Sequence, residues 1–183
     1  FSISVSPAFE LPIAEYASLF GPGGSTVVRV GVPVRRLAFL SRVGELGYAL
    51  NTYSVETGFS SAEAGAGVRL SIPLGSVVSL RAFGLGGYSL SFMKIGGERL
   101  YGNGMYLRAG AGAAFRFNPA FRISAGASYR MLPMLYGGLS FAVAAEVDLS
   151  AAKRSIDQRR SIPAISPLSG GAQAGDLLDI EDI

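Results

Sequence analysis

The segment FNPAFRISAGASYRM (residues 117–131) alternates between two kinds of side chain. From Phe121 to Met131, every odd position is apolar or aromatic, and every even position is charged, hydroxylated or glycine. Because the side chains of a strand repeat with a period of two, this pattern predicts a β-strand with one apolar and one polar face. Whether the apolar face meets the protein interior or a lipid bilayer then decides what class of protein this is.

The same alternation recurs along the chain, in segments of a length that suits a tilted membrane strand of about 9–11 residues with short extensions. An even number of such strands can close into a barrel with both ends on one side. The predicted strands are 1–13, 25–34, 37–50, 61–73, 77–92, 104–117, 121–132 and 137–149. This favours an all-β protein, an eight-stranded antiparallel up-and-down transmembrane β-barrel followed by an irregular C-terminal tail.

The predicted connections alternate between long and short. Long, Gly- and Ser-rich connections are 14–24, 51–60 and 93–103, and tight turns with Pro, Gly or Asn are 34–36, 73–76 and 118–120. Outer-membrane barrels carry long loops at the cell surface and short turns in the periplasm. All eight tyrosines lie near the predicted long-loop ends, and Phe39, Phe83, Phe115, Phe117 and Phe121 lie toward the short-turn ends. This distribution suggests two interfacial aromatic belts.

The composition argues against other membrane and nucleic-acid classes. The chain has 183 residues, of which 49% are hydrophobic and 16% charged, against a usual charged share of about 25%. No apolar run reaches the roughly 18 residues that a spanning helix needs. The net charge is +3, but the arginines are spread singly through the strands, which disfavours a nucleic-acid partner.

Catalytic chemistry is poorly represented in the sequence. Cysteine and histidine are absent, which removes thiol chemistry, Ser-His-Asp arrangements and imidazole metal sites. We therefore expect no enzyme, no catalytic or metal-binding residue and no cofactor.

The polar faces carry most of the charge. If the apolar faces meet lipid, these groups turn into the lumen and leave the lipid face almost uncharged, and an Arg or Lys at the bilayer midplane costs about 2–4 kcal/mol. The residues predicted to form a lumen charge network are Glu10, Arg29, Arg42, Glu45, Glu63, Arg69, Arg81, Arg108, Arg116, Arg122, Arg130, Glu146 and Asp148.

Counting residues from the turn end of each strand gives the height of each charged side chain in the lumen. By height, the network falls into three tiers. The upper tier has Glu10, Glu63, Arg108 and Arg130, the middle tier has Arg29, Arg42, Glu45 and Arg69, and the lower tier has Arg81, Arg116, Arg122, Glu146 and Asp148. Each tier contains both signs, and buried ions need partners. We therefore predict a plugged lumen in place of an open pore.

One predicted strand, LAFLSRVGELGY, does not fit a regular alternation. Arg42 and Glu45 differ in parity, so a regular strand would turn one of them toward lipid. We predict a β-bulge at or near Gly44 that brings both inside. The alternative is an outward Arg42 low enough to reach the lipid headgroups.

The chain resembles the small eight-stranded outer-membrane barrels, the OmpA-like and OmpX-like transmembrane domains. The resemblance covers residues 1–149 and rests on strand number, loop asymmetry and two-residue patterning. GGLSFAVAAEVDL (137–149) is similar to the family's closing strand, although here a tail follows it. The resemblance implies a bacterial outer-membrane location, with the N-terminus and the tail in the periplasm.

Residues 150–183 differ in character from the barrel. A basic stretch is followed by the Pro/Gly/Ser/Ala-rich SIPAISPLSGGAQAG and by DLLDIEDI, in which acids alternate with aliphatic residues. We expect a periplasmic linker whose end leads to a further domain or docks on a partner protein. The predicted docking residues are Asp176, Leu177, Leu178, Asp179, Ile180 and Glu181.

These observations predict a membrane anchor or structural envelope protein, with outer-membrane lipid and a periplasmic protein or domain as partners. Two alternatives remain open. One is a narrow channel or a passage for small apolar molecules, as in OmpW-like barrels. The other is a soluble lipocalin-like carrier whose apolar faces would line a ligand cavity.

Overall fold

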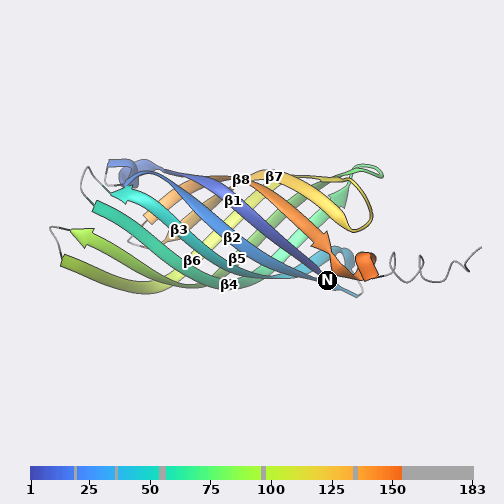
Figure 1. The fold of residues 1–183 in the computed structure, drawn as a ribbon, viewed down its shortest axis with the longest axis horizontal. Coiled ribbons are helices and arrows are strands. Elements are labelled where there is room, and N and C mark those ends of the chain that lie inside the picture. The colour runs from blue at the N-terminus through green and yellow to red at the C-terminus, as the bar shows by residue number, and fades with distance from the viewer. Residues whose placement is uncertain (19, 36, 54–56, 96–97, 134–135, 154–183) are drawn as a thin grey trace, which may run out of the picture.

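Eight antiparallel strands close into a single barrel (Figure 1). The computed structural model describes residues 1–18, 20–35, 37–53, 57–95, 98–133 and 136–153. Each strand pairs with the next, and β8 pairs with β1, so the predicted up-and-down barrel is confirmed. The elements are β1 (Ser2–Pro12), the 3-10 helix η1 (Ala14–Ser18), β2 (Phe20–Val34), β3 (Leu37–Tyr53), β4 (Thr57–Pro73), β5 (Val78–Ile95), β6 (Glu98–Arg116), β7 (Phe121–Leu132) and β8 (Tyr136–Asp148).

The strands run further than predicted at the end that carries η1 and the β3–β4, β5–β6 and β7–β8 connections, which we call the loop end. The β5–β6 ladder continues through the pair Ile95 and Glu98, so most of the predicted loop 93–103 is a hairpin. The predicted loops 14–24 and 51–60 are shortened in the same way. The sequence pattern did not show these extensions because ladder hydrogen bonds continue where the apolar alternation stops.

The opposite end carries the β2–β3, β4–β5 and β6–β7 turns, and we call it the turn end. In the β6–β7 turn, Asn118 Oδ1 accepts hydrogen bonds from the backbone N–H groups of Ala120 (2.9 Å) and Phe121 (2.8 Å). Gly75 in the β4–β5 turn has a φ of 147°, a conformation that favours glycine. The sequence signals for tight turns were therefore correct at this end.

Both ends of the barrel chain lie together at the turn end. Ser2 of β1 pairs with Asp148 of β8, and in Figure 1 the N-terminus lies beside the helical turn formed by residues 149–153. Among the described residues, no helix is long and apolar enough to cross a membrane.

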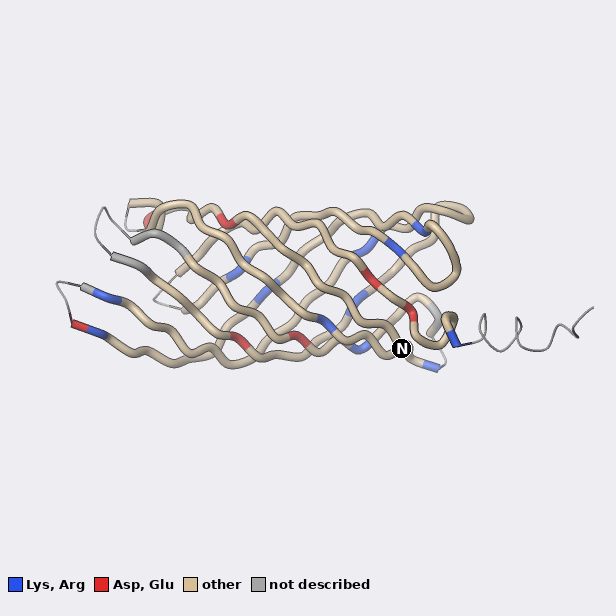
Figure 2. Tube along the Cα trace, in the orientation of Figure 1, with Lys and Arg blue, Asp and Glu red and all other residues tan. Residues whose placement is uncertain are grey.

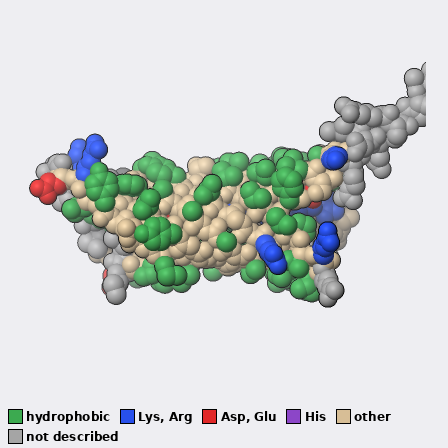
Figure 3. All heavy atoms as spheres, turned by 90° about the horizontal axis from the view of Figure 1, so that it is seen from below, with side chains coloured by type: hydrophobic (Ala, Val, Ile, Leu, Met, Phe, Trp, Pro, Cys, Tyr) green, Lys and Arg blue, Asp and Glu red, His purple; other side chains and the backbone are tan. Residues whose placement is uncertain are grey.

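The two faces of the barrel wall are inverted relative to a soluble protein. In β1, Ser2, Ser4 and Ser6 are buried, whereas Ile3 and Val5 are exposed. In β3, Leu46 is 65% exposed while its neighbour Glu45 is 3% exposed. Figure 3 shows the resulting cover of apolar side chains on the outer wall, and Figure 2 shows charged positions at several heights along the strands. Apolar rows on the outside are the reverse of the arrangement expected for a lipocalin-like carrier, whose apolar faces point inward, and they fit a lipid-facing surface.

The predicted bulge at Gly44 is wrong. The ladders of β3 with both neighbours are unbroken here, with Arg42 opposite Val32 and Val68, and Glu45 opposite Arg29 and Gly65. Regular alternation therefore places Val43 in the lumen and leaves Arg42 exposed on the outer wall.

Arg42 can lie on the outer wall because it is close to the turn end of the barrel. Its β2 partner, Val32, lies two residues before Val34, the last residue of β2. A long Arg side chain this close to the turn end can extend its guanidinium to the membrane interface. The alternative of an outward Arg42 near the headgroups therefore fits the structure.

Candidate functional site

The lumen is filled by two ionic clusters, one nearer each end. The upper cluster, toward the loop end, has equal numbers of the two signs. Arg108 is at its centre, with Nη1 3.0 Å from Glu45 Oε1 and Nη2 3.0 Å from Glu63 Oε2. Its side chain is 2% exposed, so both ion pairs are shielded from water. The members are Glu10, Glu45, Glu63, Arg29, Arg108 and Arg130.

Glu45 and Glu63 each contact one further arginine of the upper cluster. Arg29 Nε lies 2.6 Å from Glu45 Oε2, and Arg130 Nη1 lies 2.9 Å from Glu63 Oε1. Arg130 also approaches Glu10, with 3.7 Å between Nε and Oε2. The result is a chain in which arginines and glutamates alternate, with one residue from each of β1, β2, β3, β4, β6 and β7.

Hydroxyl groups use further lone pairs of the three glutamates. Ser25 Oγ donates to Glu10 Oε1 at 2.6 Å, and Ser61 Oγ donates to Glu63 Oε1 at 3.1 Å. The Tyr106 hydroxyl donates to Glu45 Oε1 at 3.5 Å. Buried charges are tolerated when they are paired and hydrogen-bonded in this way.

An aromatic cap closes the lumen between the upper cluster and the loop end. We define it as Phe20, Phe59 and Tyr136, all buried. The ring centroid of Phe20 lies 5.1 Å from that of Phe59 and 5.4 Å from that of Tyr136. The Arg130 guanidinium lies over the Tyr136 ring, 4.6 Å from its centroid. The cap and the upper cluster thus form one continuous plug.

This cap was not predicted from the sequence. Tyr136 and Tyr106 were expected in an interfacial belt, but both are buried inside the barrel. Phe83 was assigned to the other belt, but the Arg29 guanidinium lies over its ring, with 4.7 Å between Arg29 Cζ and the ring centroid. Phe20 and Phe59 were placed in predicted loops, where their parity could not be assigned.

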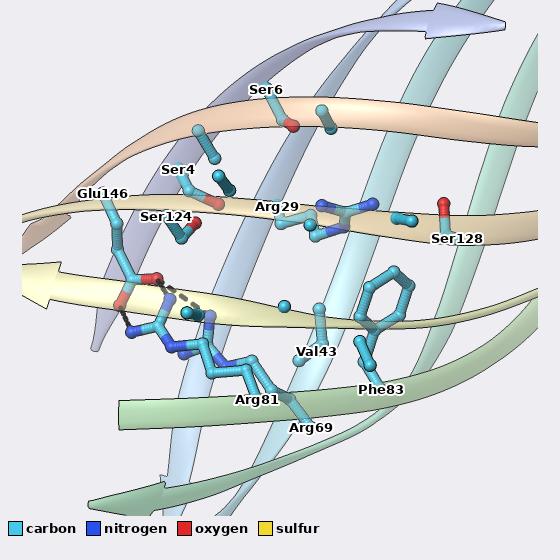
Figure 4. A pocket seen from close by; sticks show the side chains of 18 residues that line it. Ser4, Ser6, Arg29, Val43, Arg69, Arg81, Phe83, Ser124, Ser128 and Glu146 are labelled. Carbon is cyan, nitrogen blue, oxygen red and sulfur yellow. Dashed lines mark hydrogen bonds and ion pairs between the residues drawn. The ribbon is translucent and has the colours of Figure 1, made fainter. Parts of the chain in front are cut away.

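The lower cluster lies toward the turn end and gathers three arginines around one glutamate. Glu146 is reached by Nη1 of Arg69 at 2.9 Å, of Arg81 at 2.7 Å and of Arg122 at 3.2 Å. Figure 4 shows Arg69 and Arg81 converging on this carboxylate. Arg122 Nη2 also lies 3.8 Å from Asp148 Oδ2. The lower cluster therefore differs from the upper one in carrying more positive than negative charge.

Between the two clusters is a small chamber of about 80 Å³. Ser4, Ser6, Ser124 and Ser128 point into it, together with Val43 and Phe83 (Figure 4). A cavity needs about 10–15 Å³ of such space to hold one water, so the chamber has room for several waters.

Below the lower cluster the lumen widens into a cavity of about 380 Å³ at the turn end. We call this cavity the vestibule. Arg116 lies at its exposed edge and makes no ion pair with any described residue. The residues that line it include Arg69, Arg81, Arg116, Arg122, Asp148, Ser2, Ser41, Ser71 and Ser79.

The Arg–carboxylate network that the sequence predicted is present, but its groups differ from the predicted tiers. Arg29 and Glu45, predicted in the middle, belong to the upper cluster, and Arg69 belongs to the lower one. The side chain of Arg42 lies on the outer wall, and Arg116 makes no ion pair with any described residue, so neither of these two predicted members belongs to the network. The predicted docking residues 176–181 lie outside the described part of the chain.

No arrangement of three or more metal-ligating acids occurs among the described residues.

No family model and no curated protein matches the chain. Its fold is similar to that of Neisserial surface protein A, with a TM-score of 0.69 and 14% identity over 80% of this chain and 95% of that one. It is also similar to Ail, the attachment invasion locus protein of Yersinia pestis, with a TM-score of 0.57 and 17% identity over 80% of this chain and 97% of that one. These likenesses show that the chain has the fold of the small eight-stranded outer-membrane barrels.

Proposed function

We propose that this protein is a closed barrel that anchors the chain in the bacterial outer membrane and serves as a structural envelope protein. The observation that carries this proposal is the continuous plug. The aromatic cap and the alternating Arg–Glu chain, whose members come from β1, β2, β3, β4, β6 and β7, fill the upper lumen. A path for ions or small molecules would have to break buried ion pairs, each of which loses several kcal/mol when one partner is left alone.

Single-channel recording in planar bilayers tests the closed state. The purified wild-type chain is expected to insert without discrete conductance steps in 1 M KCl, because buried ion pairs and aromatic rings occupy the upper lumen. As a matched comparison, Glu63→Ala removes the carboxylate between Arg108 and Arg130 and is expected to give transient openings. Steady wild-type conductance would instead establish the narrow-channel alternative.

The proposal includes the tail. The last strand, β8, ends at the turn end, where Asp148 pairs with Ser2, and outer-membrane barrels keep this end in the periplasm. We therefore place the tail in the periplasm, with Asp176, Leu177, Leu178, Asp179, Ile180 and Glu181 as the residues that contact a partner protein or domain. A photo-crosslinking residue at Leu178 should capture one defined periplasmic protein in cells, whereas the same residue at Ser76 in the β4–β5 turn should not. Equal capture from both positions would contradict a specific docking role.

A further inference from the structure

We propose that the vestibule is a binding site for a small, soluble phosphate dianion, either inorganic phosphate or a small phosphate monoester. This inference concerns the turn end of the lumen and does not require the plug at the loop end. It rests on the charge, the guanidinium donors and the space at this end of the lumen.

The charge around the vestibule is unbalanced. Four guanidinium groups, those of Arg69, Arg81, Arg116 and Arg122, face two carboxylates, Glu146 and Asp148. This leaves an excess of two positive charges, whereas the upper cluster has three of each sign. A phosphate monoester carries about −1.5 to −2 at pH 7, so one such group neutralises the excess.

Two guanidinium groups at the vestibule are little used by the protein's own acids. Arg116 is exposed at its edge and has no carboxylate partner among the described residues. Arg122 is 21% exposed, and its Nη2 lies 3.8 Å from Asp148 Oδ2, which is too long for a hydrogen bond. Planar guanidinium groups match the oxygens of a phosphate. These two side chains can therefore donate to an anion in the vestibule.

The vestibule also has the right size and access. Its volume of about 380 Å³ is more than ten times the ~30 Å³ share of one water, so a phosphate with a short organic group fits. Ser2, Ser71 and Ser79 on its wall add hydroxyl donors, and the exposed Ser76 and Arg116 mark the opening to water. Arg69 and Arg81 of the lower cluster line the vestibule. The vestibule therefore lies between the lower cluster and the water at the turn end.

Isothermal titration calorimetry on the full chain in a zwitterionic detergent at pH 7.5 and low ionic strength tests this site. The probes are inorganic phosphate and glycerol 3-phosphate. Wild type is expected to bind one equivalent of each, and Arg116→Gln is expected to weaken binding about tenfold, as loss of one charge-assisted hydrogen bond predicts. Arg42→Gln is the matched control, since it removes the same charge at the same end of the barrel but on the outer wall.

The outcomes separate the proposal from simpler explanations. Thermal unfolding of both variants at the wild-type temperature shows that changes in binding are not caused by misfolding. No saturable binding by wild type, or equal weakening by the two substitutions, would overturn the site. Binding only to nanodiscs that contain phosphatidic acid would place the anion on a lipid, which also overturns it. Since detergent exposes both ends of the barrel to water, the result depends neither on membrane orientation nor on conductance.

Discussion

Single carboxylates hold several guanidinium groups inside this barrel. Glu45 contacts Arg29 and Arg108 while its side chain is shielded from water, and Glu146 contacts three arginines. Replacing such an acid with an apolar residue leaves uncompensated charges in the lumen, which is more costly than losing the pair.

We therefore expect Glu45→Ala and Glu146→Ala to destabilise the barrel. The loss for Glu45→Ala should be about 3–5 kcal/mol, the range for breaking a buried ion pair. Thermal or urea unfolding in detergent measures the difference. Glu98→Ala, at the exposed start of β6, is the control and should unfold like wild type. Wild-type unfolding temperatures for both lumen variants would show that the network is not structural.

Glycine in this lumen leaves room for large partners. A Cβ at Gly65 would clash with the Tyr106 hydroxyl and lie 2.9 Å from the Gly86 carbonyl oxygen, whereas a Cβ at Gly44 would meet nothing within 4 Å. Gly65→Ala should therefore destabilise by about 1–3 kcal/mol through overpacking, and Gly44→Ala should be neutral or slightly stabilising. Unfolding in urea compares the two. Equal free energies of unfolding would mean that Tyr106 does not occupy this position.

At the scale of strands, the two-residue period predicted most of the charged side chains that face the lumen but not which of them meet. Counting residues from the turns placed Arg69 in the same tier as Glu45, but Arg69 pairs with Glu146 of β8. Counting from each turn assumes that all turns lie at one height, and tilted strands with a sheared register break that assumption. The aromatic cap was missed because Phe20 and Phe59 lie in the loop-end parts of β2 and β4, where the sequence shows no clear alternation. The register of β3 was missed because parity alone cannot show that Arg42 lies near the interface.

The register of β3 gives a direct test, because the chain has no cysteine that would interfere with labelling. A spin label on Arg42→Cys is expected to be accessible to oxygen or to a water-soluble relaxation agent, because this position lies on the outer wall. A label on Val43→Cys, 3% exposed in the wild type, should be shielded from both. Reversed accessibilities would restore the bulge at Gly44.

At the scale of the whole molecule, the barrel has two unlike ends. The loop end has long hairpins and the aromatic cap, and the turn end has tight turns, the vestibule and both barrel termini. Placing the loop end at the cell surface predicts which sites a membrane-impermeant maleimide reaches in intact cells. Glu98→Cys should be labelled, whereas Ser76→Cys and Leu178→Cys should be labelled only after the outer membrane is permeabilised. Labelling of Ser76→Cys in intact cells would reverse the proposed orientation.

The alternating Arg–Glu chain also bears on how the barrel assembles. Its links join β7 to β1 and β3 to β6, strands that are far apart along the chain. The guanidinium of Arg130 meets Glu10 only when the first and last hairpins have come together around a common axis. Until that moment these groups remain hydrated, and hydration opposes entry into hydrocarbon. Insertion and closure are therefore expected to occur as one concerted event, in which an incomplete sheet has little tendency to enter the bilayer alone.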